Sequence, residues 1–386
     1  MTPKTFMLIA GEASGDLLAA ELVSAIRRQS PDAKFFGAGG SKMAAAGVEL
    51  AFDLTNHAVV GFTDVLKNYL KFQKLFNQLR ALAIERKPDA IIGVDYGGFN
   101  LRFGHAIKEF ARYDSSDWRP KIIQFVSPQV WASRPHRADL LARDYDLLLS
   151  IFPFEKNWYA RRVPNLRVEF VGHPMVDRLS RSGRLEPAQI ENSEPADAAC
   201  YKILLLPGSR KSELQKHLPV ILPALKLIHE KLPSAKVKMV LPDDALSQLA
   251  KSLGANVEIQ IGDLPRALAQ TDLAIASTGT VTMECTFFGV PTVTLYRARF
   301  LDLGIKAGLI TAKWFTMPNL LANEEIYPEF LGAAATPENI SRAALELLQN
   351  ESRRLKIKSQ LREILGSLGA PGAADRAATA ILGLFR

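Results

Sequence analysis

The sequence has few cysteines and no long apolar run. Cys200 and Cys285 are the only cysteines among 386 residues, which excludes a disulfide-stapled fold and predicts buried free thiols in a reducing compartment. No apolar stretch approaches the ~20 residues of a membrane span. The first apolar run, Thr5–Ala10, is too short for a signal-peptide core and has no cleavage site after it. We therefore expect a cytoplasmic protein.

Motifs for metal binding and for common hydrolases are also missing. The six histidines are scattered, with no H-E-x-x-H and no Cys/His cluster. The sequence has no G-x-S-x-G elbow and no Gly-Lys-Ser/Thr P-loop. Asp144-Tyr145-Asp146 has the D-x-D spacing of metal-dependent sugar transferases, but it precedes an apolar run and is interpreted as a turn between helix and strand. We expect neither a metal ion nor another cofactor.

The composition is that of a soluble globular protein of about two domains. Hydrophobic residues make up 48% and charged residues 23% of the chain. The net charge of +8 favours anionic partners such as nucleotide phosphates or an anionic lipid leaflet. Zinc-finger spacing, an RNP-like aromatic motif and a long basic tail are absent, so no nucleic-acid partner is expected.

Short aliphatic runs alternate with longer amphipathic segments. Several runs are apolar at consecutive positions, as in strands covered on both faces of a parallel sheet. The strands expected are 5–10, 34–38, 90–94, 122–126, 147–151, 168–172, 203–206, 236–241, 257–261, 273–276 and 292–296. The helices expected between them include 14–29, 62–85, 100–112, 154–161 and 213–231. Strands alternating with helices predict right-handed βαβ units and an α/β fold.

The alternation is interrupted once, which divides the chain. Residues 180–199 are polar, carry two prolines and indicate a linker or surface segment. We expect one Rossmann-like domain over 1–178 and a second over 200–350, with a ligand cleft between them. A helical tail, 351–386, is expected to pack back on the N-terminal domain of its own or a partner chain.

The strongest local signal is Leu206-Pro207-Gly208-Ser209-Arg210, at the junction of a strand and a helix. Gly208 allows a close approach of the backbone, and the helix start offers free N–H groups and a positive dipole end to a phosphate. Ser209 adds a hydroxyl donor and Arg210 a planar cation. We predict phosphate binding here; the alternative is a structural turn with a surface arginine.

A second strand-to-helix junction reads Ala-Ser-Thr-Gly-Thr-Val-Thr-Met-Glu from residue 276. Ser277, Thr278, Gly279 and Thr280 can cap the helix and bind phosphate oxygens. Glu284, about one turn into the helix, can hold ribose hydroxyls. Two such helix starts in one domain suit a nucleoside diphosphate, although a capped helix with a solvated Glu284 is the simpler alternative.

Two further junctions lie in the first half. Gly11-Glu12-Ala13-Ser14-Gly15-Asp16 follows the first strand, where Ser14 or Asp16 is expected to cap a helix. Asp95, in Gly93-Val94-Asp95-Tyr96-Gly97-Gly98, ends an apolar strand, where open α/β sheets bind ligands. An ionised carboxylate there can accept a hydroxyl proton; the alternative is a capping or turn aspartate.

The segment 62–79 predicts a helix with a wide aromatic and aliphatic face. Such a face serves a protein core in most helices, but bordering lysines also suit contact with an anionic leaflet or acyl chains. Both interpretations stay open. The residues proposed to face lipid are Phe62, Val65, Leu66, Lys67, Tyr69, Leu70, Lys71 and Phe72.

Eight segments together resemble the lipid-A-disaccharide synthase family, in the expected order and over nearly the whole chain. They are GEASGD (11–16), GVDYGGFN (93–100), VSPQVWASR (126–134), FPFEKNWY (152–159), FVGHPMVD (170–177), LLPGSRKSEL (205–214), ASTGTVTMEC (276–285) and MPNLLANEEIYPEFL (317–331). The resemblance implies a GT-B fold, meaning two Rossmann-like domains facing a cleft. It also implies an inverting, metal-independent glycosyltransferase on the cytoplasmic face of the inner membrane.

The resemblance further implies the substrates and the roles of residues. A 2,3-diacylglucosamine unit passes from UDP to the 6-hydroxyl of 2,3-diacylglucosamine 1-phosphate, giving a β-1,6-linked disaccharide phosphate and UDP. Asp95 is then the acceptor base, and Glu12 lies near the donor. Residues 208–210 contact the diphosphate, while Thr280, Glu284 and Asn319 contact UDP. The helix 62–79 matches the region of the family that faces the membrane.

The chain departs from the family pattern at three positions. Gly97 and Gly98 stand where Pro and Asp are usual, and Ser133 where a second Trp is common, which bears on loop rigidity and on how the sugar or acyl chain is held. Two rival functions remain at this level: a UDP-sugar 2-epimerase of the same architecture, and a non-catalytic nucleotide- or lipid-binding module. A homodimer also stays open.

Overall fold

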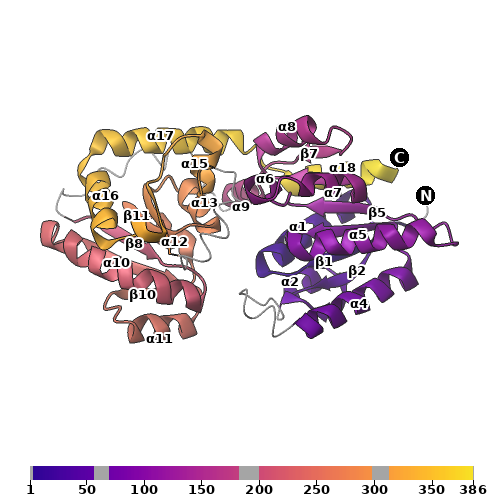
Figure 1. Cartoon of the computed structure of the whole chain (residues 1–386), viewed down its shortest axis with the longest axis horizontal. Coiled ribbons are helices and arrows are strands. Elements are labelled where there is room, and N and C mark those ends of the chain that lie inside the picture. The colour runs from indigo at the N-terminus through magenta and orange to yellow at the C-terminus, as the bar shows by residue number, and fades with distance from the viewer. Residues whose placement is uncertain (1–2, 56–68, 182–199, 298–312, 386) are drawn as a thin grey trace. The chain divides into compact units, whose positions relative to one another are not determined.

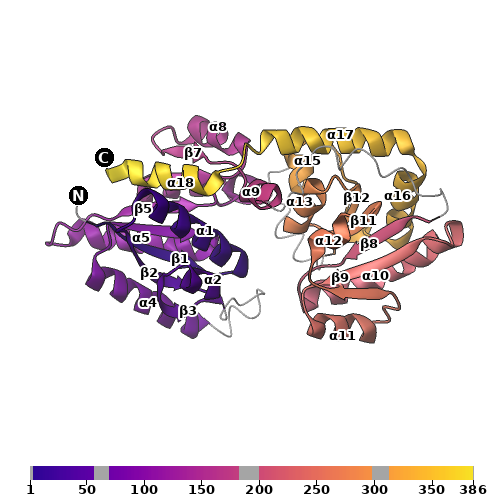
Figure 2. The ribbon, with the colours of Figure 1, turned by 180° about the vertical axis from the view of Figure 1, so that it is seen from behind.

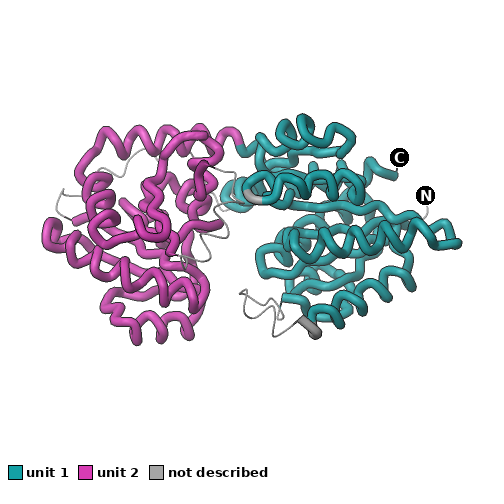
Figure 3. The backbone as a smooth tube through the Cα atoms, in the orientation of Figure 1, with its two compact units in different colours: residues 1–184, 368–386 teal, residues 185–367 magenta. Residues whose placement is uncertain are grey.

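The computed structural model describes residues 3–55, 69–181, 200–297 and 313–385 (Figure 1). The chain divides into two compact units (Figure 3). Unit 1 comprises residues 1–184 and 368–386, and unit 2 comprises residues 185–367. Each unit has its own parallel sheet, so the predicted α/β fold class is confirmed.

Unit 1 is built on a seven-stranded parallel sheet of order β3-β2-β1-β4-β5-β6-β7. The central strands are apolar at consecutive positions because helices cover both faces. Val94 pairs with Ala10 on one side and Phe125 on the other, so the carboxyl ends of these strands meet at one edge. The strands are β1 Thr5–Ala10, β2 Lys34–Gly39, β3 Glu49–Asp53, β4 Ala90–Val94, β5 Lys121–Phe125, β6 Leu147–Ser150 and β7 Val168–Phe170.

The helices of unit 1 connect these strands. Because right-handed crossovers run outward in both directions from β1 and β4, α1 and α5 cover opposite faces of the sheet. α4 packs beside α5, and α18 beside α1 (Figure 2). The helices are α1 Ala13–Gln29, α2 Ser41–Ala45, α4 Tyr69–Arg86, α5 Gly97–Tyr113, α6 Val130–Ser133, α7 Arg137–Asp144, α8 Pro153–Arg162, α9 Pro174–Arg181 and α18 Ala373–Leu382, with the short 3-10 helix η4 Gly383–Phe385 after α18.

Unit 2 repeats this architecture with six parallel strands of order β10-β9-β8-β11-β12-β13. The strands are β8 Lys202–Leu206, β9 Lys236–Leu241, β10 Glu258–Ile261, β11 Leu273–Ser277, β12 Thr292–Tyr296 and β13 Glu329–Leu331. The helices are α10 Lys211–Lys231, α11 Asp244–Ser252, α12 Leu264–Leu268, α13 Thr280–Phe287, α15 Met317–Ala322, η3 Gly332–Ala334, α16 Pro337–Gln349 and α17 Glu351–Ser367. A continuous apolar core joins this sheet to its helices.

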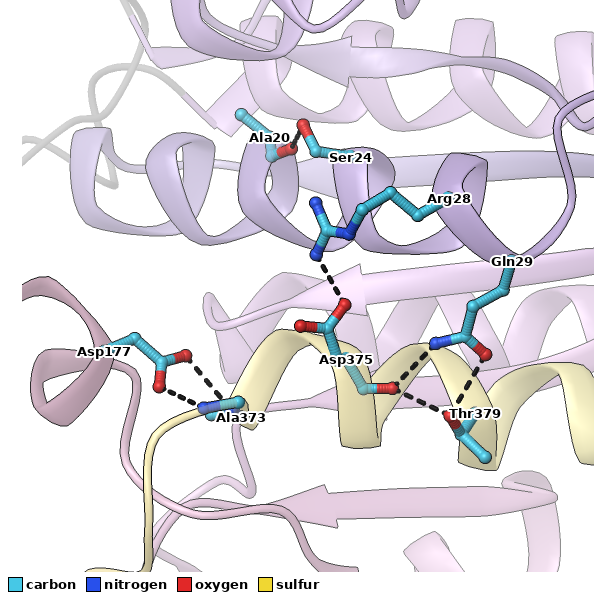
Figure 4. Close-up of polar contacts among 9 residues, drawn as sticks. Ala20, Ser24, Arg28, Gln29, Asp177, Ala373, Asp375 and Thr379 are labelled. Atoms are coloured by element: carbon cyan, nitrogen blue, oxygen red, sulfur yellow. Dashed lines mark hydrogen bonds and ion pairs between the residues drawn. The ribbon is translucent and has the colours of Figure 1, made fainter. Parts of the chain in front are cut away.

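The C-terminal tail belongs to both units. Residues up to 367 belong to unit 2 and residues from 368 onward to unit 1, whereas the sequence suggested a boundary at residue 351. α17 packs on α13, α15 and α16 of unit 2. α18 packs on α1 of the same chain, where Asp177 accepts N–H groups of Gly372 and Ala373 and Asp375 pairs with Arg28 (Figure 4). The expected linker, 180–199, lies almost entirely outside the described residues.

Candidate functional site

Glu12 and Asp95 lie at the point where the strand order of the unit 1 sheet reverses. From the adjacent strands β1 and β4, successive strands are added outward on opposite sides. Glu12 follows β1 and Asp95 follows β4, so both residues stand at this switch point. Open α/β sheets bind ligands outside the carboxyl ends of their strands at such a point. The predicted pair is therefore brought to one edge of the sheet.

The backbone of Asp95 is held in an unusual conformation. Asp95 has φ of 52° and Tyr96 has φ of 44°, both in the left-handed region, which costs a non-glycine residue about 1–2 kcal/mol. The Asp95 N–H donates to the carbonyl of Phe125 at 2.9 Å. The Asp95 carbonyl accepts the side-chain amides of Asn100 and Gln124, each at 2.8 Å. All three hydrogen bonds are made by backbone atoms of Asp95, whose carboxylate is half-buried.

The electrostatics of this edge favour a proton acceptor. Burial raises the pKa of Asp95, and the negative charge of Glu12 raises this pKa further, while a hydrogen bond from the backbone N–H of Tyr96 opposes the rise. Glu12 itself is exposed. A carboxylate with a raised pKa is a stronger base when ionised. Asp95, when ionised, is therefore a stronger proton acceptor than an exposed aspartate.

The GEASGD segment serves the site differently from the prediction. The ring of Tyr96 lies over Gly11, so a side chain at residue 11 would place its Cβ 2.4 Å from that ring. Asp16 does not cap α1: its buried carboxylate accepts the N–H groups of Gly40, Lys42 and Met43 at the start of α2. Ser14 is exposed and the N-cap of α1 is Glu12, without a side-chain bond. Asp16 is therefore a structural residue.

In unit 2 the two predicted phosphate loops lie side by side. β8 and β11 are adjacent strands at the switch point of that sheet, with Leu206 paired to Ala276. The loop at 207–210 follows β8, and Ser277 ends β11. Helices α10 and α13 therefore both begin at the same edge of the sheet. Two neighbouring helix N-termini suit the binding of a diphosphate.

Glu213 occupies part of the first loop. Gly208 has φ of 130°, and a side chain there would meet the Glu213 carboxylate at 2.4 Å. The N–H of Ser209 donates to Glu213 Oε2 at 2.8 Å, and the exposed Arg210 lies 3.9 Å from Glu213 Oε1. The sequence prediction missed this carboxylate, which takes the backbone donor assigned to phosphate. Its position at the third residue of a helix, where acidic residues cap the N-terminus, was the available signal.

His217 ties the same loop to β12. The buried imidazole contacts the carbonyl of Pro207 through Nδ1 at 2.6 Å and accepts the N–H of Arg297 at Nε2, 3.2 Å away. Burial lowers the pKa of His217, so the neutral ring donates at one nitrogen and accepts at the other. His217 thus orients the loop at 207–210.

The second loop and Asn319 also differ in detail from the predictions. The N-cap of α13 is Gly279, with φ of 146°, so no side chain caps this helix. Ser277 is buried and Thr278 and Glu284 are half-buried, whereas Gly279 and Thr280 are exposed. Asn319 is fully buried, and its amide already serves four hydrogen bonds, to Ile326, Tyr327 and Glu329. Asn319 therefore fixes the segment after α15 rather than offering a free donor.

The comparison with protein families decides between the remaining interpretations. A family model described as "Lipid-A-disaccharide synthetase" matches residues 6–380. The chain belongs to the lipid-A-disaccharide synthase family. Among curated relatives, lipid-A-disaccharide synthase of Trichlorobacter lovleyi is 34% identical over 391 residues, covering 99% of this chain and 98% of the relative. The synthase of Syntrophus aciditrophicus is 33% identical over 393 residues, covering 100% and 99%.

Solved structures show the shared fold. CalG4, the calicheamicin glycosyltransferase, has a TM-score of 0.58 at 16% identity, with 99% of this chain and 98% of that chain covered. The UDP-GlcNAc 2-epimerase of Methanocaldococcus jannaschii, in complex with UDP-GlcNAc and UDP, has a TM-score of 0.63 at 12% identity, covering 98% and 99%. At these identities only the fold is common. The synthase family membership makes the chain a glycosyltransferase of GT-B fold and does not support the epimerase alternative.

The predicted lipid-facing helix is only partly described. Phe62, Val65, Leu66 and Lys67 lie outside the described residues. α4 includes Tyr69, Leu70 and Lys71, but the described structure does not cover their side chains. Phe72, also in α4, is half-buried. From Leu75 onward α4 packs into the core of unit 1. In the described ranges no helix is long and apolar enough to cross a membrane.

The segment Asp144-Tyr145-Asp146 lies between a helix and a strand, as the sequence predicted. α7 ends at Asp144 and β6 begins at Leu147, so the motif forms the expected turn. Asp144 pairs with Arg143 and His105, and Asp146 accepts from Lys108 and the N–H of Ile122. Within the described part of the chain, no group of three or more His, Cys, Asp and Glu side chains is arranged to hold a metal ion.

Proposed function

We propose that this family member transfers 2,3-diacylglucosamine from its UDP conjugate to the 6-hydroxyl of 2,3-diacylglucosamine 1-phosphate, with inversion at the anomeric carbon. The observation that carries the proposal is Asp95 at the switch point of unit 1, with a half-buried carboxylate of raised pKa on a backbone held by three hydrogen bonds. A fixed base is what an inverting transfer requires on the acceptor side.

In this mechanism Asp95 accepts the proton of the acceptor hydroxyl as its oxygen attacks the anomeric carbon. The new carbon–oxygen bond forms on the face opposite UDP, and the bond between the anomeric carbon and the diphosphate oxygen breaks. The electron pair of that bond leaves with UDP. Glu12 lies beside this base, and its negative charge keeps the pKa of Asp95 high.

Unit 2 binds the leaving group in the same proposal. Arg210 and the N-termini of α10 and α13 stabilise the negative charge that develops on the diphosphate, without an acid catalyst or metal ion. Gly208, Ser209, Ser277, Thr278, Gly279 and Thr280 form the two loops, and Glu284 binds the ribose. Asn319 acts on UDP indirectly, by fixing the segment after α15.

Peripheral contact with the anionic cytoplasmic face of the inner membrane belongs to the proposal as well. The aromatic face and the lysines of 62–79 support it. Flotation with vesicles containing anionic lipid tests this contact; a Lys67→Glu/Lys71→Glu variant should lose most of its binding, and unchanged binding would contradict it. A homodimer is tested in the same preparation by light scattering.

The decisive experiment is a reaction of the purified protein with both substrates in the presence of chelator, followed by mass spectrometry. We expect the disaccharide phosphate and UDP, with UDP release dependent on the acceptor; UDP release without acceptor would favour the epimerase chemistry. Asp95→Asn should lower the rate by about 10²–10⁴-fold. Asp32→Asn, the same change at an exposed position of unit 1, is the control. A normal rate with Asp95→Asn, or product only after addition of a divalent metal, would end the proposal.

A further inference from the structure

We propose that Glu155 is a positioning residue of the acceptor-side site, which in its protonated form holds the loop 127–131 against the turn that carries Asp95. The inference rests on the proposed function for its kinetic consequence. Glu155 lies at the start of α8, just after β6, at the same edge of the sheet as Asp95. No sequence motif singled it out, although it follows a strand end within the FPFEKNWY segment.

The surroundings of Glu155 suit a neutral carboxyl group. Its side chain is fully buried. Oε1 accepts the indole N–H of Trp131 at 3.0 Å, whereas Oε2 has no hydrogen-bond partner among the described residues. No ion pair joins Glu155 to a cation in the described part of the chain, and burying an unpaired carboxylate is strongly unfavourable.

The protonation state follows from this burial. Burial raises the pKa of Glu155 to about 7, and the smaller opposing effects come from Trp131, Ser127 and the backbone of Phe152. None of these opposing groups carries a charge. Glu155 is therefore mostly protonated in mildly acidic solution and becomes an uncompensated buried anion as the pH rises.

Glu155 and Tyr159, one turn later on α8, hold the loop after β5. The Tyr159 hydroxyl donates to the carbonyl of Pro128 at 3.2 Å and accepts from Ser127 at 3.2 Å. The ring of Phe154 meets the ring of Trp131 edge to face, with centroids 4.9 Å apart. Phe154, Glu155 and Tyr159 of α8 thus contact Ser127, Pro128 and Trp131 in this loop.

This loop packs directly on the turn that carries Asp95. A Cβ at Gly97 would lie 3.0 Å from Cβ of Pro128, so the two residues are in close contact. The strand before the loop also accepts the N–H of Asp95 through Phe125. A buried Glu155 anion lacks hydration, so its ionisation favours entry of water between α8 and the loop 127–131, which would loosen the support of the acceptor base.

The other titratable groups nearby cannot mimic this titration. The pKa of Tyr159 is raised well above its ordinary value by burial. His173, whose ring packs on Phe152, has its pKa lowered to about 3 by burial and Arg178. Asp95 acts in the opposite sense, because its ionisation increases activity as the pH rises. A loss of kcat on the alkaline side is therefore assigned to Glu155.

The test compares Glu155→Gln with the wild-type protein across pH. Glutamine keeps an acceptor for the Trp131 N–H but cannot ionise, so we expect kcat within about threefold of wild type at pH near 6 and no alkaline decline. Trp131→Phe removes the indole donor that lowers the pKa, so its alkaline decline should shift to higher pH. Glu155→Ala should lower kcat by about tenfold or more, while the affinity of the full-length variant for UDP, measured by calorimetry, stays unchanged.

A readout independent of activity separates this inference from the proposed function. The infrared band of a protonated carboxyl group should appear in the wild-type protein at mildly acidic pH, vanish as the pH rises through about 7, and be missing in Glu155→Gln. Persistence of the same band in Glu155→Gln, or an unchanged alkaline decline in that variant, would overturn the proposal. If the band behaves as expected but no disaccharide forms, the proposed function fails while the buried neutral carboxyl stands.

Discussion

The side-chain amide of Gln124 donates a 2.8 Å hydrogen bond to the backbone carbonyl of Asp95. Gln124 is fully buried on β5, and the amide of Asn100 reaches the same carbonyl from α5. Two donors on one oxygen hold the left-handed backbone that presents the Asp95 carboxylate. The position of the Asp95 carboxylate thus depends on the neighbouring strand β5 as well as on the loop that carries Asp95.

Replacing Gln124 should therefore reduce catalysis without affecting nucleotide binding. We expect Gln124→Ala to lower kcat by about 10- to 100-fold, because small displacements of a catalytic group are costly. Its affinity for UDP should be unchanged, since Gln124 belongs to unit 1. Steady-state kinetics and calorimetry check both values, with exposed Gln215→Ala as the control. A wild-type kcat would show that Gln124 does not position Asp95.

Glu12 should set the position of the acidic limb in the pH dependence of kcat/KM. Its negative charge raises the pKa of Asp95, so Glu12→Gln lowers that pKa and leaves the base ionised at lower pH. The acidic limb of the kcat/KM profile should move to lower pH. Asp32→Asn, an exposed charge change in the same unit, should leave the limb in place. A shift toward higher pH, or none, would contradict this coupling.

Glu213 should weaken nucleotide binding in the native protein. Its carboxylate accepts the Ser209 N–H and lies near Arg210, so a diphosphate bound there meets a like charge. Glu213→Gln keeps an acceptor but removes the charge, and UDP should bind about fivefold more tightly, equivalent to about 1 kcal/mol. Glu230→Gln, exposed at the far end of α10, is the matched control. Weaker binding by Glu213→Gln would instead show that the charge holds the loop in its binding form.

Replacing Gly98 with alanine should stabilise the folded protein. A Cβ at this position meets nothing within 4 Å, whereas one at Gly97 would press on Pro128 at 3.0 Å. Both residues begin α5. Because alanine restricts the unfolded chain more than glycine, Gly98→Ala should stabilise unit 1 by about 0.5–1 kcal/mol, and Gly97→Ala by less. Thermal unfolding of the two variants, compared side by side, checks the order; a more stable Gly97→Ala would reverse it.

The inner strands could be predicted because helices bury both of their faces. Consecutive apolar residues located Thr5–Ala10, Ala90–Val94, Lys236–Leu241 and Thr292–Tyr296 with the bounds that the structure shows. β3 and β13 were missed. Both are edge strands, only partly buried, and include Glu49, Asp53 or Glu329. A strand paired on one side only does not need the apolar run that reveals the inner ones.

The sequence alone determined the two parallel sheets, the family and the loops that follow the central strands, because burial and turn geometry leave patterns among neighbouring residues. Only the tertiary structure decided which polar side chains in those loops are free. Asp16 meets the N–H groups of α2, Asn319 those of residues 326 and 327, and Glu155 the indole of Trp131. These partners come from other turns of the chain, so local patterns cannot distinguish a structural carboxyl group from a reactive one.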